Sequence, residues 1–153
     1  MIYQNDKVYE GILKNVLFVC KHNVFRSRVA EECLNGYGTT KYRAESAGLI
    51  SLDEETLSKE KVHPLQKEVA RRYGLDLSPK SRSLSHSILK RMDIVIIVAD
   101  DVSPEIIQEE KSFNVKVILW KIKDVEEDSL DLEQCIVSTI KQICEKVEEF
   151  VND

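Results

Sequence analysis

The residues best suited to chemistry lie in one short segment near the N-terminus, Cys20-Lys21-His22-Asn23-Val24-Phe25-Arg26-Ser27. A cysteine thiolate is a nucleophile, and the planar fork of an arginine can hold two oxygens of a tetrahedral anion. Because Cys20 opens the segment and Arg26 stands near its end, both side chains can face one anion bound between them. The segment therefore predicts an anion-binding loop, residues 21–27, with Cys20 as its nucleophile.

Two regular elements flank this loop and would position it. Residues 16–19 form a continuous apolar run, which is typical of a strand buried on both faces. Apolar residues then recur at helical spacing at Ala30, Cys33, Leu34 and Tyr37. A loop that leaves a strand and enters a helix directs backbone N–H groups into one concave space, at the positive end of the helix dipole. Such a loop binds a phosphate-like dianion and favours the thiolate form of a cysteine.

The rest of the chain alternates between strand and helix patterns. Strands are expected at residues 15–20, 41–46, 93–98 and 115–120, and helices at residues 27–36, 64–74, 85–92, 104–111 and 130–151. This alternation predicts an α/β fold, a single-domain three-layer sandwich whose four-stranded parallel, doubly wound sheet has helices on both faces. We expect the domain at residues 15–153, an N-terminal extension at residues 1–14, and the ligand at the carboxyl ends of the strands.

Composition narrows the classes of function. A chain of 153 residues with 42% hydrophobic content suits one core, and its net charge of −5 gives no electrostatic basis for binding nucleic acid or a membrane. No apolar run reaches the length of a membrane span, and the N-terminus lacks the order of a signal peptide, so we expect a cytoplasmic protein. All four cysteines are expected as free thiols, with Cys33, Cys135 and Cys144 on apolar helix faces. The histidines lack ligand spacing, so neither a metal nor another cofactor is expected.

With its flanks, the Cys20 loop resembles the low-molecular-weight protein tyrosine phosphatase superfamily, which also contains the thioredoxin-coupled arsenate reductases. The resemblance covers roughly residues 15–151, most of the chain. Besides the loop it rests on Ala44-Glu45-Ser46-Ala47-Gly48, Gly74-Leu75-Asp76-Leu77-Ser78, Met92-Asp93-Ile94-Val95-Ile96-Ile97 and Trp120-Lys121-Ile122-Lys123-Asp124.

The resemblance implies roles for the side chains of the loop. Cys20 would attack phosphorus and form a phosphocysteine, while Arg26 binds the phosphoryl oxygens. The Ser27 hydroxyl could donate a hydrogen bond to the thiolate, and Ser27 could equally be an ordinary helix N-cap. Asn23 tolerates the left-handed backbone of a tight loop, and the resemblance ties its side chain to Ser46.

A phosphatase of this kind also needs an acid that protonates the leaving oxygen. The resemblance places this role on Asp124, although Val125 stands where the superfamily usually has proline. Asp100 and Asp101, at the end of the third expected strand, are weaker choices, and Glu126 is another nearby carboxylate. The alternative without a catalytic role is that residues 124–128 form a solvated acidic turn.

Departures from the superfamily bear on the reaction. Tyrosine phosphatases usually carry Gly, Cys and Pro where this chain has His22, Phe25 and Arg28, and His22 and the missing second cysteine favour the arsenate reductases. Reduction of arsenate needs further thiols, however, and residues 98–114, where those reductases keep a redox pair, contain no cysteine.

We therefore expect a cysteine-dependent phosphatase that acts on a phosphate monoester, with protein phosphotyrosine implied by the resemblance alone. Its partner would be a phosphorylated protein or a small phosphate or other oxyanion. One alternative is an arsenate reductase that uses Cys20 with an external thiol donor such as thioredoxin. Another is a binder of phosphate or phosphopeptides without turnover, which would bind the oxyanion but show no hydrolysis.

Overall fold

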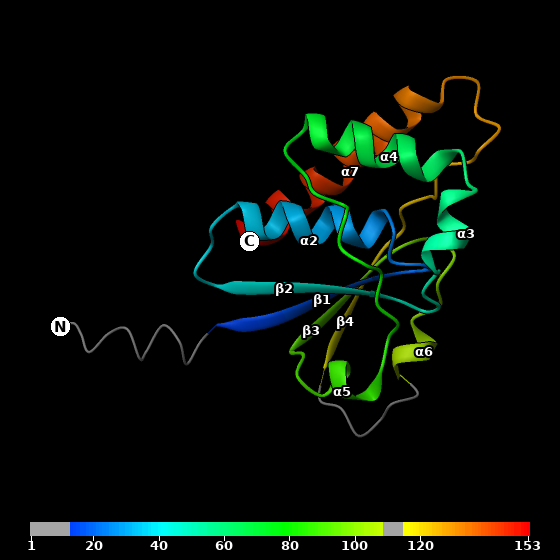
Figure 1. Cartoon of the computed structure of the whole chain (residues 1–153). Helices are drawn as coiled ribbons and strands as arrows, with labels where there is room; N and C mark the ends of the chain where they lie inside the picture. Colours follow the sequence, from blue (N-terminus) through cyan, green and yellow to red (C-terminus); the bar gives the residue numbers. More distant parts are fainter. Residues whose placement is uncertain (1–12, 109–114) are drawn as a thin grey trace.

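A parallel β-sheet forms the centre of the computed structural model, which describes residues 13–108 and 115–153 (Figure 1). Its strands are β1 (Lys14–Cys20), β2 (Tyr42–Gly48), β3 (Ile94–Val98) and β4 (Lys116–Trp120). They pair in the order β2-β1-β3-β4, and every pairing is parallel. The predicted α/β fold with a four-stranded parallel sheet is confirmed.

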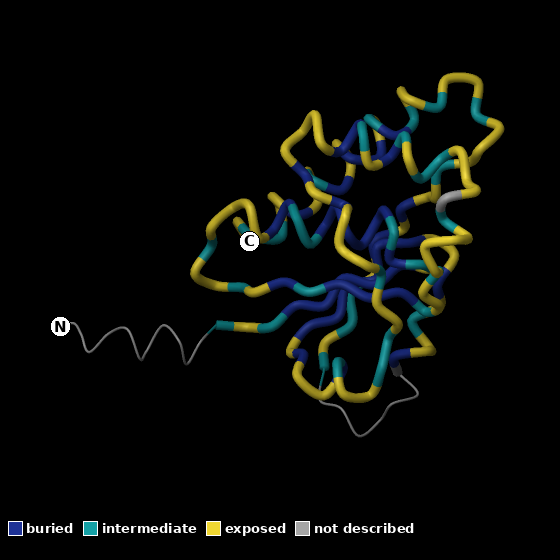
Figure 2. The backbone as a smooth tube through the Cα atoms, viewed as in Figure 1, coloured by how far each residue is buried: buried dark blue, intermediate teal, exposed yellow. Residues whose placement is uncertain are grey.

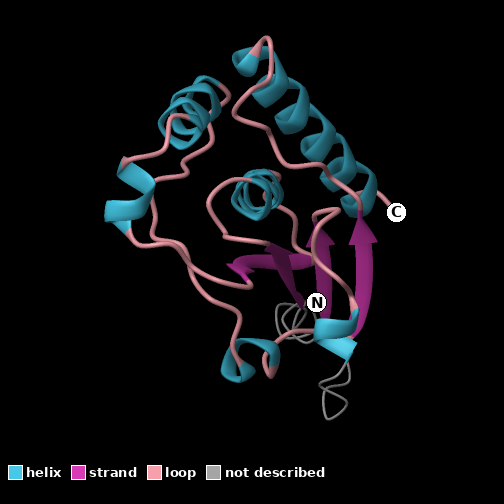
Figure 3. Cartoon of the chain, turned by 90° about the vertical axis from the view of Figure 1, so that its right-hand side faces the viewer, coloured by secondary structure: helices cyan, strands magenta, loops and turns pink. Residues whose placement is uncertain are grey.

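Helices cover both faces of this sheet (Figures 1 and 3). On one face lie α2 (Arg26–Gly36), α4 (Val62–Arg72) and α7 (Leu132–Val151), and α3 (Glu54–Ser58) adjoins α4. The short helices α5 (His86–Leu89) and α6 (Glu105–Gln108) lie on the other face. Within the described residues, no helix is both long enough and apolar enough to cross a membrane.

Strand β1 explains why the apolar run at residues 16–19 is continuous. Val16 and Phe18 belong to the core under α2, α4 and α7, whereas Leu17 and Val19 belong to the core on the opposite face. All four side chains are fully buried, and the buried backbone concentrates along the strands (Figure 2). A strand packed on both faces has little freedom to move, so β1 holds Cys20 at a fixed position at its carboxyl end.

Some element boundaries differ from the sequence-based expectation. Helix α4 begins at Val62, two residues before Pro64, and α2 begins at Arg26 rather than Ser27. Proline fits any position of a first helical turn, so it does not mark the first residue. The expected helix at 104–111 is observed as α6, and its residues 109–111 lie outside the described residues, as do residues 1–12 of the expected extension.

The expectation of four free thiols is wrong for Cys33 and Cys144, which form a disulfide. The two cysteines are 111 residues apart in sequence, so their spacing carries no hint of the pairing. Helices α2 and α7 pack against each other on one face of the sheet and bring the two Cα atoms to 5.9 Å, a normal distance for a disulfide. Cys20 and Cys135 remain free.

Candidate active site

The loop between β1 and α2 has the backbone shape of a tight anion cradle. Asn23 adopts a left-handed conformation with φ of 58°. The end of β2 lies directly against the loop at Gly48, where a Cβ atom would stand 2.7 Å from the Asn23 nitrogen and 2.7 Å from the His22 carbonyl carbon. Backbone atoms cannot yield by that amount, so this contact requires glycine.

Helix α2 begins without the usual features of a helix start. Its N-cap is Phe25, which makes no side-chain capping bond, and its first turn contains no acidic residue. That turn instead contains Arg26 and Arg28, although cations are unfavourable at the positive end of a helix dipole. The free N–H groups of this turn, together with the Arg26 guanidinium at its start, are thus suited to an anion. Because Ser27 lies inside the helix, its interpretation as the N-cap is wrong.

A chain of hydrogen bonds leads from the proposed nucleophile into the protein. The Cys20 Sγ lies 3.0 Å from the Ser27 Oγ, and the Asn23 Nδ2 donates to that hydroxyl at 2.7 Å and to the Ser46 Oγ at 2.9 Å. The Asn23 Oδ1 accepts from the Arg82 backbone N–H at 2.9 Å. The Cys20, Asn23, Ser27 and Ser46 side chains are all buried. These hydrogen bonds therefore fix the loop from inside the protein.

Arg26 is buried and is surrounded by acceptors. Its Nη1 donates to the Ile122 carbonyl at 3.0 Å, and Asp101 approaches the guanidinium at 3.1 Å and 3.4 Å. Asp100 lies 3.8 Å from Nη1, and Asp124 lies 3.8 Å from Nε. The parallel sheet thus brings carboxylates from the ends of β3 and β4 to the arginine of the β1 loop. With one cation among three carboxylates, an incoming phosphate has to compete for Arg26.

The remaining predicted site residues differ in what they can offer a ligand. Phe25 is buried in the core, so it can offer a ligand only its backbone N–H. Lys21 is exposed, and the His22 Nδ1 lies 3.1 Å from the Ile50 carbonyl. Among the alternative acids, Asp100 and Asp101 lie at Arg26, whereas Glu126 forms an ion pair with Lys123 at 3.6 Å.

A cavity of about 1210 Å³ borders the loop at Asn23 and Val24, between α3, α4 and residues 74–81. Its apolar lining includes Leu52 and Leu57, and neither Cys20 nor Arg26 lines it. His63 also faces it; burial lowers the pKa of His63, and the nearby charge of Lys67 lowers it further. The cavity therefore lies beside the candidate anion site and does not include it.

Sequence reasoning missed several residues that shape this site. In the sequence Gly48 stands out only as part of a motif, because its contact with the loop depends on the pairing of β1 with β2. Glu31 accepts from the Ser46 Oγ at 2.5 Å and from Arg28. Its position four residues after Ser27, on one face of α2, is the signal that could have indicated it.

An α/β domain that holds a buried cysteine and arginine in a loop at the end of its first strand defines a class of proteins built around a thiolate and an oxyanion. Within that class, the chain belongs to the low molecular weight phosphotyrosine protein phosphatase family, whose sequence model matches residues 15–153. Among curated proteins, none matches this sequence.

Solved structures share the fold over most of the chain. Wzb from Vibrio vulnificus, in complex with benzylphosphonate, has a TM-score of 0.71 at 20% identity, covering 91% of this chain and 97% of that chain. The low molecular weight protein tyrosine phosphatase from T. tengcongensis has a TM-score of 0.68 at 22% identity, covering 91% and 98%. An arsenate reductase in the phosphate binding state has a TM-score of 0.67 at 27% identity, covering 91% and 97%.

Proposed function

We propose that this protein is a cysteine-dependent phosphatase that hydrolyses phosphate monoesters, with protein phosphotyrosine as its substrate class, through a phosphocysteine intermediate. The observation that carries the proposal is the 3.0 Å contact between the Cys20 Sγ and the Ser27 Oγ. A hydroxyl that donates to sulfur stabilises the thiolate both as the attacking group and as the leaving group. Membership of the family supports the phosphate chemistry, and phosphotyrosine is an inference from the family description.

In the first step, the Cys20 thiolate attacks phosphorus, so a sulfur–phosphorus bond forms while the ester oxygen–phosphorus bond breaks. Asp124 gives its proton to the leaving oxygen. In the second step, the Asp124 carboxylate takes a proton from a water molecule that attacks phosphorus. The sulfur–phosphorus bond then breaks, and Cys20 returns to the thiolate with the Ser27 hydroxyl as its hydrogen-bond donor. Arg26 binds the phosphoryl oxygens through both steps.

The arrangement around Arg26 supports Asp124 as the acid. Asp101 makes two close contacts with the guanidinium, which suits a residue that orients Arg26. Asp124 is about half exposed, and its Oδ1 lies 3.8 Å from the Arg26 Nε and accepts the Val125 N–H at 2.9 Å. Both contacts use the same oxygen, so the exposed carboxyl group can still approach a leaving group from the solvent side. When a phosphate takes over Arg26, Asp124 is no longer held at Nε and its side chain can turn toward the leaving oxygen.

Arsenate reduction is the second candidate, because the arsenate reductase in the phosphate binding state is 27% identical over most of this chain. A reductase needs thiols that resolve the bond between sulfur and arsenic. Cys33 and Cys144 are already joined to each other, and Cys135, on α7, is the remaining free thiol. The reductase mechanism would therefore depend on an external thiol donor such as thioredoxin, which makes it the less favoured proposal.

Hydrolysis of p-nitrophenyl phosphate between about pH 4 and pH 8 tests the proposal. We expect Cys20→Ser to abolish turnover while calorimetry shows retained phosphate binding, because the loop N–H groups and Arg26 remain. Cys135→Ser, which removes the other free thiol, is the matched control and should hydrolyse at the wild-type rate.

The same assay separates the alternatives. Turnover that survives in Cys20→Ser would remove Cys20 from the mechanism. Oxidation of a dithiol that depends on arsenate, without phosphate hydrolysis, would assign the protein to the reductases. Phosphate binding with neither activity would leave a non-catalytic phosphate binder.

A further inference from the structure

The guanidinium of Arg28 is a buried charge that the proposed reaction does not use. Its side chain is 4% exposed and lies in the first turn of α2, where the helix dipole opposes a cation. Its Nε is buried and, among the described residues, has no hydrogen-bond partner. A buried charge at an unfavourable helix end is expensive unless another group compensates it.

Glu31 provides that compensation from the next turn of the same helix. The Arg28 Nη1 donates to the Glu31 Oε1 at 2.9 Å, and the Glu31 side chain is only 14% exposed. On its other side, Arg28 reaches the Asp76 carbonyl at 3.5 Å. The Asp76 carboxylate also faces this region: hydrogen bonds from Ser78 lower its pKa, and the charge of Arg28 lowers it further. Arg28 thus pairs with Glu31 within α2 and, through the Asp76 carbonyl, also connects the helix with the segment that follows α4.

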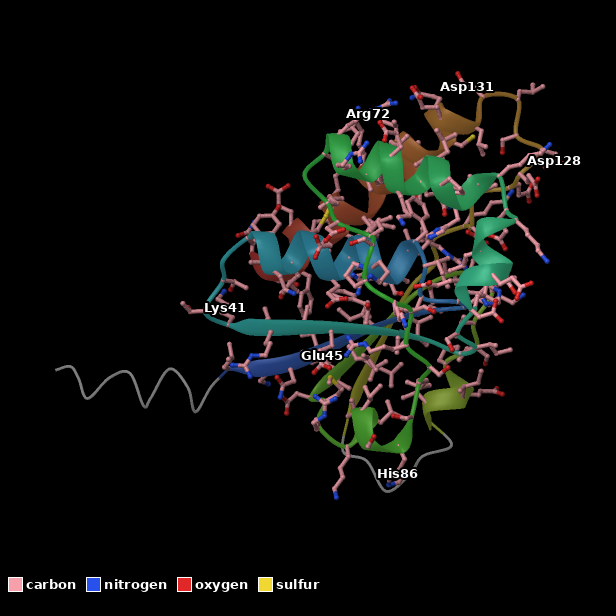
Figure 4. The ribbon with its side chains drawn as sticks, in the orientation of Figure 1. Lys41, Glu45, Arg72, His86, Asp128 and Asp131 are labelled. Atoms are coloured by element: carbon pink, nitrogen blue, oxygen red, sulfur yellow. A yellow bond between two sulfur atoms is a disulfide. The ribbon has the colours of Figure 1, made fainter. Side chains whose placement is uncertain are left out.

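The acceptors in the network decide where each hydrogen points. Asn23 accepts the Arg82 N–H at its Oδ1, so both hydrogens of its Nδ2 point to Ser27 and Ser46. The Arg82 side chain pairs in turn with Glu45, which holds this part of the chain in place. Figure 4 labels Glu45 on β2. Since Ser27 accepts from Asn23, its own hydrogen is left for the Cys20 sulfur.

Glu31 controls the other branch of this network. A carboxylate can only accept, so the Ser46 hydroxyl donates to Glu31 and keeps a lone pair for Asn23. Without the carboxylate of Glu31, the direction of the Ser46 hydrogen is no longer fixed. In Glu31→Gln the amide can either accept from the Ser46 hydroxyl or donate to it, and a donating amide competes with Asn23 for the Ser46 oxygen. Without Arg28, Glu31 becomes an uncompensated buried charge whose field opposes a thiolate.

We propose that Arg28 and Glu31 act together as a positioning pair, which keeps the Ser27 hydroxyl aligned as the hydrogen-bond donor to the Cys20 thiolate. The inference rests on the proposed function because it assigns a purpose to that thiolate. Neither residue touches the substrate. Their effect reaches the sulfur only through Ser46, Asn23 and Ser27.

The test compares Arg28→Met, Glu31→Gln and the double variant with wild type. Arg43→Met and Glu149→Gln are matched controls, because both residues are exposed. The first readout is the rate at which iodoacetamide alkylates Cys20, followed by mass spectrometry from about pH 5 to pH 9. The second readout is kcat and KM for p-nitrophenyl phosphate over the acid half of that range.

Arg28→Met should slow alkylation near pH 6 by about tenfold, because it leaves the negative charge of Glu31 uncompensated. Glu31→Gln should slow alkylation less, because the misalignment of the Ser27 hydroxyl is partly offset by the loss of a negative charge near the sulfur. The difference in alkylation rate between variant and wild type should decrease as the pH rises, because a thiol loses its proton at high pH even without an aligned hydrogen-bond donor. kcat should fall while the inhibition constant of phosphate stays the same, since phosphate contacts the loop and Arg26. The double variant should lose less than the product of the single losses, because it leaves no uncompensated charge.

The opposite pattern would overturn the inference. A loss that is equal at every pH, losses that multiply in the double variant, or a parallel loss of phosphate binding would each show that the pair merely supports the fold. Arg28→Lys keeps the charge and should retain most of the reactivity; if Arg28→Met does not fold, this variant and Glu31→Gln carry the test. Absence of hydrolysis in the wild type would defeat the proposed function, whereas the alkylation comparison would still decide the role of the pair.

Discussion

At the scale of single residues, the most informative side chain is Arg26. It is 3% exposed, and its neighbours are the Ile122 carbonyl and the carboxylates of Asp100, Asp101 and Asp124. Binding of a phosphate dianion therefore exchanges one set of negative partners for another. The affinity of the site should depend on how readily those carboxylates release the guanidinium.

Asp124→Asn should lower kcat for aryl phosphate hydrolysis by about 10²–10⁴, the usual contribution of general acid–base catalysis. Asp101→Asn should act mainly on KM, because Asp101 orients Arg26 through two close contacts. Asp128→Asn, on the exposed segment after β4, is the control and should leave both constants unchanged. A wild-type kcat in Asp124→Asn together with a large loss in Asp101→Asn would transfer the acid role to Asp101.

At the scale of elements, helix α2 connects the candidate active-site loop with the hydrophobic core. Its first turn carries Arg26 and Ser27, and two turns later Cys33 is bonded to Cys144 on α7. The same helix packs against β1 and β2. A change at the disulfide should therefore affect the stability of the whole layer more than the geometry of the loop.

Cys33→Ser should lower the free energy of unfolding by about 2–5 kcal/mol, because the cross-link restricts a long loop in the unfolded chain. Hydrolysis should persist, since buried side chains of α2 and α7 still pack together. Urea denaturation with and without a reductant measures the effect, and Cys135→Ser serves as the control. If reductant leaves the wild-type midpoint unchanged, the disulfide contributes nothing to stability.

Sequence patterns predicted elements better than the pairings between them. Strands β1 and β3 followed from apolar runs, and the Cys20–Arg26 spacing indicated the loop. The link between Cys33 and Cys144 and the contact of Gly48 with the loop were missed because both depend on how distant elements pack. The start of α2 was placed one residue late because Ser27 is a typical N-cap residue type.

At the scale of the whole molecule, the parallel sheet brings the ends of β1, β3 and β4 to one edge. This arrangement explains why carboxylates at positions 100, 101 and 124 meet an arginine at position 26. The sequence predicted that edge as the ligand site, but not the ion pairs. Their formation depends on side-chain directions that strand order alone does not specify.

The stability of the folded chain should decrease on the acid side because of His63. Burial, and then Lys67, lowers the pKa of His63 below its ordinary value of 6.5, so the folded state favours the neutral ring. The stabilisation is present above that value and is lost as the pH falls through it toward the folded-state pKa. Urea midpoints at about pH 7.5 and pH 5.5 should differ less in His63→Gln than in wild type. His86→Gln, at an exposed position, is the control, and an equal acid loss in His63→Gln would contradict the prediction.

The hydrogen bond from Arg26 to the Ile122 carbonyl joins residues separated by 96 positions. During synthesis, the loop leaves the ribosome long before β4 exists, so the nascent chain carries Cys20 and Arg26 without the groups that hold the arginine. The site is completed only when the last strand joins the edge of the sheet. The contact between Cys20 and Ser27, by contrast, needs only the loop itself. The loop can therefore form early in synthesis, whereas Arg26 reaches its final partners only after the later strands have been made.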